Sequence, residues 1–310
     1  MRTSRSLILL LVLAVVAACR SSAKVPEGAT PDAVKAMADA RMAEGDYPAA
    51  ADLYDAVTDR FPRTPQADES EWLAAEAWFL DGDWSEAQDR YQSFFDSHPL
   101  VNLGALGERM YEIGVRRYER GKAGVLGIGL LPTSERGLKA LQWITEKLPN
   151  GTRADDAFFF IGRARMASHL YDDAVLNFDQ ILAHYPQSEW THEARYLRGL
   201  SYLAINRGPS YDKDSLVRAR RDFSDYVRII ERSEALRTEY ADRLEEAKAR
   251  LSETNERLAR KDLKIANFYR SQERFEGERL YLDDAATRYP ETEAGREAAA
   301  RLAPADRDGE

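Results

Sequence analysis

Hydrophobic and small side chains recur along this chain at spacings that fit one face of an α-helix. In four places an aromatic residue stands fifteen residues before a proline: Tyr47, Trp84, Tyr171 and Phe275 precede Pro62, Pro99, Pro186 and Pro290. Ser134 takes the aromatic position in a fifth copy, which ends at Pro149. A small residue comes three positions after the aromatic in most copies and a large apolar residue seven positions after it, so all three share one helical face. Because proline cannot continue a helix, each copy predicts a helix that ends just before its proline.

A second amphipathic stretch precedes each of these helices. It carries its own small residue nine positions before the aromatic, as Ala38, Ala75, Gly162 and Ala266; the later helices carry Ala50, Ala87, Gly137 and Ala174. Small residues on two facing helices let their backbones approach closely. The pattern resembles the tetratricopeptide repeat, a helix–turn–helix unit, with a period of 37 residues between Tyr47 and Trp84. We therefore expect an all-α tetratricopeptide-repeat superhelix of about six units, over residues 32–63, 69–99, 107–149, 154–186, 192–231 and 259–290.

Two segments depart from the regular repeat. Inserts separate the paired helices of the third unit (residues 121–133) and of the fifth (residues 206–213). Residues 234–274 contain neither glycine nor proline and keep a helical period. We expect one long helix there, or two nearly collinear ones, joining the last units.

The first residues have the pattern of a bacterial lipoprotein signal. The basic start MRTSRS is followed by an apolar run of twelve residues, too short to span a bilayer core of about 30 Å as a helix. The run ends in Val16-Ala17-Ala18-Cys19, which resembles a lipobox, and Cys19 is the one cysteine in the sequence. We expect a signal peptide over 1–18, acyl chains on Cys19 and a flexible tether over 19–31. The repeats would then fill residues 32–303 and leave a disordered tail over 304–310.

Composition and motifs argue against nucleic acid and against catalysis. The net charge is −9, and it becomes −11 once Arg2 and Arg5 leave with the signal peptide, so phosphate backbones would be repelled. The four histidines do not stand at metal-ligand spacing, and the glycines at 127–129 do not complete a phosphate-binding loop. We expect no enzyme, no metal and no cofactor.

The C-terminal half carries a more specific resemblance. The segments EARYLRGL (193–200), ARRDFSDYVRII (219–230), ERLARKDLKIANFY (256–269) and RYPETEAGREA (288–298) resemble the BamD lipoproteins, also called the ComL or YfiO family. Residues 154–303 carry the resemblance best, and this chain has six units where that family usually has five. The resemblance implies a lipid-anchored scaffold on the periplasmic face of the outer membrane. Such scaffolds dock through their C-terminal half on the POTRA domains of the β-barrel assembly subunit, and their N-terminal repeats receive unfolded outer-membrane proteins.

The first helices of the units offer candidates for a peptide-binding groove. These candidates are Met42, Trp72, Phe79, Phe159, Arg163, Met166 and Tyr196. An aromatic and methionine-lined groove suits an extended apolar peptide, but Trp72, Phe79 and Phe159 could instead pack between neighbouring units. A second function also fits the sequence: a periplasmic repeat adaptor lipoprotein for cell-wall synthesis or for Tol–Pal-type envelope constriction.

Overall fold

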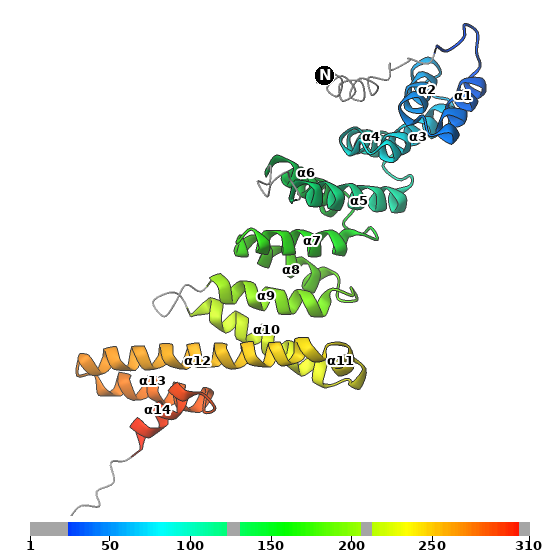
Figure 1. The fold of residues 1–310 in the computed structure, drawn as a ribbon. Coiled ribbons are helices and arrows are strands. Elements are labelled where there is room, and N and C mark those ends of the chain that lie inside the picture. Colours follow the sequence, from blue (N-terminus) through cyan, green and yellow to red (C-terminus); the bar gives the residue numbers. More distant parts are fainter. Residues whose placement is uncertain (1–23, 123–130, 206–212, 304–310) are drawn as a thin grey trace, which may run out of the picture. The chain divides into compact units, whose positions relative to one another are not determined.

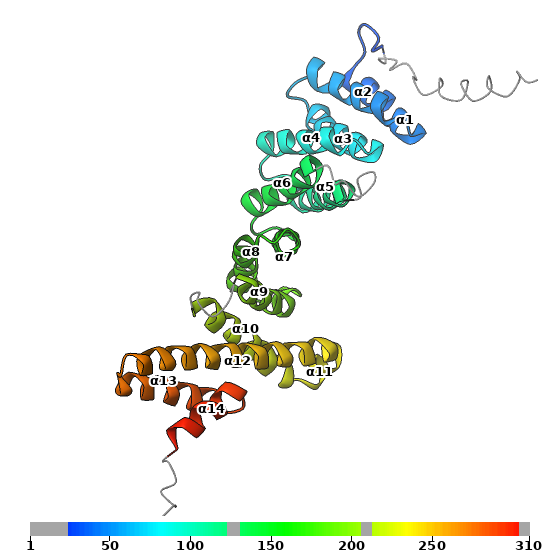
Figure 2. The ribbon, with the colours of Figure 1, turned by 60° about the vertical axis from the view of Figure 1, so that its left-hand side comes forward.

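The computed structural model describes residues 24–122, 131–205 and 213–303. These residues form a succession of helices joined by short connections (Figures 1 and 2). The described residues form fourteen helices and no strand. Chain contacts divide the protein into two compact units, residues 1–144 and 145–310. The inserts expected at 121–133 and 206–213 fall mostly outside the described residues, as do the lipobox, residues 19–23 of the tether, and the tail. The fold class expected from the periodicity is confirmed.

The first unit is built from three helix pairs. Its helices are α1 (Pro31–Glu44), α2 (Tyr47–Arg60), α3 (Pro65–Asp81), α4 (Trp84–Ser97), α5 (Leu103–Lys122) and α6 (Leu131–Lys147), of which α6 runs on into the second unit. The second unit continues with α7 (Ala154–Ala167), α8 (Tyr171–His184), α9 (Thr191–Ile205), α10 (Asp214–Glu231), α11 (Glu234–Glu239), α12 (Ala241–Ser271), α13 (Phe275–Arg288) and α14 (Glu293–Leu302).

Local sequence signals set the ends of the early helices. Thr30 and Thr64 are N-caps whose side chains accept hydrogen bonds from Ala33 and Ala67, and a proline opens each helix. Gly45 and Gly82 end the same helices with φ values of 78° and 81°, a left-handed conformation that side chains disfavour. The turns between paired helices are therefore specified locally.

Each second helix ends two residues before the expected proline. The last helical residues are Arg60, Ser97, Lys147, His184 and Arg288, and the next residue caps the helix before Pro62, Pro99, Pro149, Pro186 and Pro290. The small residues predicted to lie between paired helices are buried: Ala38, Ala50, Ala75, Ala87, Ala174 and Ala266 are all 0 % exposed. A Cβ on Gly162 would lie 2.7 Å from the ring of Phe178. These contacts confirm the predicted repeat frame.

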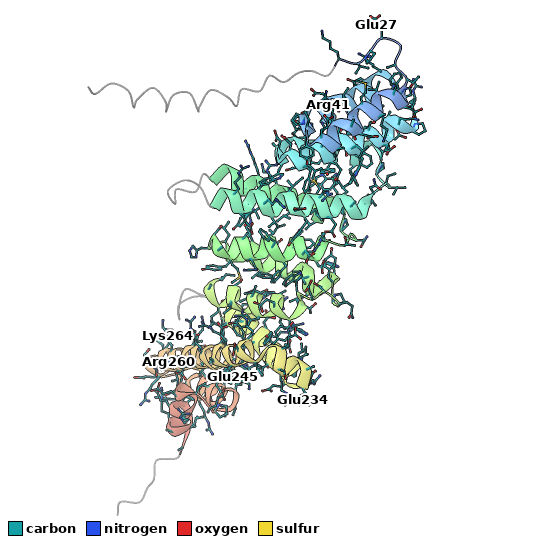
Figure 3. The ribbon with its side chains drawn as sticks, turned by 45° about the vertical axis from the view of Figure 1, so that its right-hand side comes forward. Glu27, Arg41, Glu234, Glu245, Arg260 and Lys264 are labelled. Atoms are coloured by element: carbon teal, nitrogen blue, oxygen red, sulfur yellow. The ribbon has the colours of Figure 1, made fainter. Side chains whose placement is uncertain are left out.

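The long helical segment has a break that periodicity did not locate. Helix α11 ends at Glu239, and Tyr240, with φ −108° and ψ 26°, separates it from α12. Helix α12 then runs for 31 residues, packing its first part against α10 and its second part against α13 (Figure 1). Charged side chains such as Glu245, Arg260 and Lys264 project from its exposed side (Figure 3).

The last repeat departs from the predicted pattern in two ways. Phe275, expected on the buried face, is 65 % exposed. The small-residue position is taken by Glu278, which is 9 % exposed and pairs with Arg301 at 2.6 Å. Arg301 belongs to α14, a helix that the repeat pattern did not predict separately. Helix α14 packs its small residues on α12 and α13 and so closes the end of the apolar core.

Candidate functional site

In the first unit the predicted groove residues form a half-buried aromatic surface. Trp72 and Phe79 lie on one face of α3, because residues spaced by three or four positions are neighbours on a helix. The Trp72 ring packs 5.1 Å from Tyr91 and 5.3 Å from Phe94 of α4. The Arg109 guanidinium lies over the Phe79 ring, 4.5 Å from its centroid. Met42, near the end of α1, is also half-buried.

Polar side chains fix the aromatic surface in place. Glu76 accepts hydrogen bonds from Arg109 Nε at 2.9 Å and Nη2 at 2.8 Å, a bidentate pair. It also accepts one from Tyr91 Oη at 2.5 Å. Burial raises the pKa of the Tyr91 hydroxyl, so that group remains a donor. The surface therefore combines apolar rings with a carboxylate and a guanidinium, which can contact apolar side chains and a peptide backbone.

The first repeat shows the same tyrosine–carboxylate arrangement. Tyr54 Oη donates to Asp39 at 2.7 Å, and both pairs join residues fifteen positions apart. Lys35 then bridges Asp39 and Glu69, each at 3.2 Å, and so connects α1 to α3. These contacts were not among the features predicted from the sequence. The signal was present, because both tyrosines stand at the same repeat position, fifteen residues after an acidic side chain.

In the second unit two of the predicted groove residues lie in the apolar core. Phe159 is 5 % exposed and stacks on Trp190, with 4.1 Å between ring centroids. Tyr196 is fully buried between Phe223 and Tyr226. Both side chains therefore contribute hydrophobic area that stabilises the fold.

The other two predicted residues of this unit lie nearer the surface. Arg163 is exposed, and its guanidinium carbon is 5.8 Å from the centroid of the Phe159 ring. Met166 is half-buried and packs against the cluster formed by Phe159 and its neighbours. The structure brings Phe159, Arg163 and Met166 together on α7, and it places Tyr196 in a different cluster.

Buried charges, which the sequence analysis missed, cross-link the second unit. Arg198 donates from Nε and Nη2 to both oxygens of Asp222, at 2.8 and 2.5 Å, and from Nη1 to Asp179. Burial raises the pKa of the Asp222 carboxyl, although the hydrogen bonds from Arg198 oppose that rise. A cross-link of this kind is costly to break, because removing one partner leaves the other buried without compensation.

A second buried carboxylate ties α12 to the start of α10. Asp262 is 0 % exposed and pairs with Lys213 Nζ at 2.6 Å. The sequence signal for both cross-links is an acidic residue, Asp222 or Asp262, at a position where the helical period faces the core. Its partner cannot be recognised from the sequence, because it lies 24 or 49 residues away.

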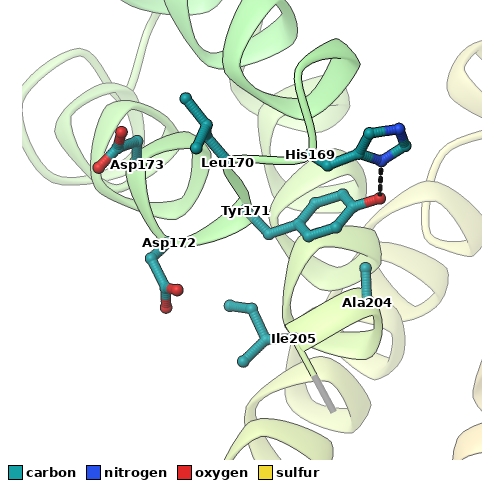
Figure 4. Close-up of a pocket in the computed structure, with 7 residues that line it drawn as sticks. All are labelled: His169, Leu170, Tyr171, Asp172, Asp173, Ala204 and Ile205. Carbon is teal, nitrogen blue, oxygen red and sulfur yellow. Dashed lines mark hydrogen bonds between the residues drawn. The ribbon is translucent and has the colours of Figure 1, made fainter. Parts of the chain in front are cut away.

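A cleft of about 630 Å³ opens beside the turn between α7 and α8 (Figure 4). His169 and Tyr171 line it, joined by a 2.8 Å hydrogen bond between Nδ1 and the phenol oxygen, together with Leu170, Asp172, Asp173, Ala204 and Ile205. The two aspartates lie in the first turn of α8, where negative charge complements the helix dipole.

Across residues 24–122, 131–205 and 213–303, histidine, cysteine and acidic side chains do not gather into a group of three that could hold a metal ion. None of the helices described in those ranges is long and apolar enough to cross a membrane. The arrangement is one of packed helix pairs with half-buried aromatic surfaces and charged cross-links. These features define a helical repeat protein of the tetratricopeptide type.

The chain belongs to the YfiO family, described as outer membrane lipoproteins, whose model matches residues 133–308. This region takes in most of α6 and all of the helices after it. No curated protein matches the chain.

Several solved tetratricopeptide proteins are similar to the chain. The C-terminal part of a repeat protein from Cytophaga hutchinsonii has 13 % identity and a TM-score of 0.39, covering 90 % of both chains. A repeat protein from Parabacteroides merdae has 16 % identity and a TM-score of 0.35, covering 87 % of this chain and 97 % of its own. A thermophilic repeat protein from Thermus thermophilus has 20 % identity and a TM-score of 0.31, covering 69 % and 98 %. The fold assignment rests on the helix pairs themselves.

Proposed function

We propose that this protein is a scaffold of the β-barrel assembly machinery, anchored to the periplasmic face of the outer membrane through acyl chains on Cys19. Its second unit would dock on the POTRA region of the barrel-forming subunit. Its first unit would receive segments of unfolded outer-membrane proteins. The membership in a family of outer membrane lipoproteins carries this proposal.

Exposed apolar side chains in the family-matched region support a docking role there. Nine large hydrophobic side chains of the described residues are exposed, and six of them lie within residues 133–308. These six are Leu170, Leu176, Val217, Phe268, Phe275 and Leu280. Where such side chains adjoin one another on the surface, they favour contact with another protein. Leu176 and Leu280 are 63 % and 61 % exposed and hold the same repeat position, five residues after the aromatic.

The peptide-receiving role is proposed for the half-buried aromatic surface of the first unit. Trp72 and Phe79 offer ring faces, Met42 offers an adaptable side chain, and the Arg109–Glu76 pair offers polar contacts. Within the second unit, α7 carries an exposed cation, Arg163, and a half-buried methionine, Met166. Phe159 and Tyr196 would contribute only by holding these helices in place.

Co-purification of the lipidated protein with the barrel subunit tests the docking role. Replacing both Leu176 and Leu280 by glutamate should abolish co-purification, because two charges would enter an apolar contact. The matched control is Leu80→Glu, at a side chain that is 48 % exposed in the first unit, and it should retain the barrel subunit. If the wild-type protein itself retains no barrel subunit, the proposal fails and the adaptor role in cell-wall synthesis or envelope constriction is favoured.

A further inference from the structure

The negative charge of this protein is concentrated in its first two helix pairs. Residues 24–100 hold 17 acidic and six basic side chains, a net charge of −11, whereas residues 101–310 together carry −1. Charge of one sign on a compact body destabilises it through self-repulsion. Folding stability therefore does not account for this concentration, and attraction of an oppositely charged partner is one effect that such a field has.

The exposed carboxylates form a regular array on the second helices. Asp52 and Asp59 lie on one stripe of α2, and Asp89 and Asp96 lie on the equivalent stripe of α4, 37 residues later. All four are exposed, on the side of each helix opposite its buried residues. Among the described residues none of the four forms an ion pair or a side-chain hydrogen bond. We call these four residues the acidic face.

Arg117 of α5 interacts electrostatically with Asp89 but forms no ion pair with it, and the cation between the two second helices is engaged by other carboxylates. Arg90 lies between α2 and α4 and is already paired with Asp55 at 2.5 Å and with Glu86 at 3.0 Å. Burial raises the pKa of the Asp55 carboxyl, and the negative charges of Asp59 and Asp52 raise it further. The positive charge of Arg90 acts in the opposite direction and lowers this pKa. The surface between the two helices therefore remains negative.

Two independent features indicate a protein partner rather than small counter-ions. A cleft of about 310 Å³ lies between α2 and α4, lined by Asp55, Asp59, Ser93 and the ring of Phe94 among others. Directly after α4, Leu100 is 87 % exposed and Val101 is 46 % exposed. Leu100 is the most exposed large hydrophobic side chain of the described residues. Apolar groups at the end of a charged face are typical of protein interfaces, where desolvated apolar contacts add to charge complementarity.

We propose that the acidic face docks a lysine- and arginine-rich segment of a partner protein, with an apolar side chain of that segment packed on Leu100 and Val101. The basic side chains would meet the two rows of carboxylates on α2 and α4. The four aspartates lie on second helices, whereas Met42, Trp72 and Phe79 of the proposed peptide-receiving surface lie on first helices. The two sites can therefore be tested separately.

A fluorescein-labelled peptide of alternating lysine and leucine is the probe for this site. Its dissociation constant for the full mature protein is measured by fluorescence anisotropy over a range of salt concentrations. Converting the four aspartates of the acidic face to asparagine should raise the dissociation constant by about tenfold or more at low salt. The variant should also flatten the dependence on salt, because fewer charges are screened.

The control variant has the same change in net charge on the second unit. Asp172, Asp173, Glu273 and Glu276 are exposed there, and converting them to amides should leave the dissociation constant within about twofold. Circular dichroism checks that both variants keep their helix content.

The apolar contact has its own test. Replacing Leu100 and Val101 by serine should weaken binding severalfold at constant salt, and a peptide of alternating lysine and glycine should bind correspondingly less. Equal loss in the acidic-face and control variants would overturn the proposal, because attraction to the overall charge would then suffice. Unchanged binding of the serine variant would also overturn the proposal. That result would show that the peptide binds through its charge alone, without an apolar contact to Leu100 and Val101.

Discussion

The close contact between α5 and α6 makes Gly137 the most sensitive glycine of the first unit. A Cβ built on Gly137 would lie 2.5 Å from the backbone nitrogen of Tyr118 and 2.6 Å from the carbonyl oxygen of Gly114. Both obstructing atoms belong to the backbone of α5, so no side-chain rotation can relieve the clash. We predict that Gly137→Ala forces the two helices apart.

The expected magnitude follows from two opposing effects. Replacing glycine by alanine inside a helix contributes about 0.5–1 kcal/mol of stability through backbone entropy. Overpacking a close contact costs about 1–3 kcal/mol, and a backbone obstruction lies at the upper end of that range. The net result is a destabilisation of about 2 kcal/mol, which lowers the melting temperature by about 4–8 °C in a body of this size.

Thermal unfolding followed by circular dichroism measures the effect, and hydrogen exchange of the α5 and α6 amides localises it. Gly104→Ala is the matched control, because Gly104 also lies in α5 and a Cβ there meets no atom within 4 Å. It should be neutral or slightly stabilising. Equal melting shifts for the two variants, or a higher melting temperature for Gly137→Ala, would show that the helices do not approach as described.

Two further predictions concern the anchor and the acid stability of the second unit. Cys19→Ser should leave the signal peptide uncleaved by the lipoprotein peptidase and the protein without acyl chains; a wild-type mature mass without lipid would refute the lipobox interpretation. Burial, with a smaller contribution from Arg195, lowers the pKa of His192 below its usual value, so the unfolded chain binds this proton more readily than the folded protein. Stability of the second unit should therefore fall as pH drops through about 6.5. His192→Gln should reduce this loss of stability, measured as the change in melting temperature between a pH above 6.5 and a pH below it. If the variant and the wild type lose the same stability over this range, His192 is not the group responsible.

The helix pairs and their close contacts could be predicted from the sequence because each depends on residues near one another along the chain. Ala38 and Ala50, or Ala75 and Ala87, belong to adjacent helices joined by a short turn, and glycine, threonine and proline mark the helix ends. A period of 3.6 residues shows which face of a helix is apolar. The family resemblance in the C-terminal half could be recognised for the same reason, because it depends on continuous segments of the sequence.

What covers each apolar face was decided only by the tertiary structure. Periodicity placed Phe159, Tyr196 and Phe79 on comparable faces of first helices, but neighbouring elements bury Phe159 and Tyr196 and leave Phe79 half-exposed. Phe275, which the same periodicity placed on a buried face, is 65 % exposed.

The break at Tyr240 and the charged cross-links also needed the folded chain. Asp222 and Asp262 are stable in the core only because Arg198 and Lys213 reach them from other helices. A sequence pattern reports the polarity of a side chain and its direction from one helix axis. Burial and pairing depend on a second helix, whose position is set by the packing of the whole unit.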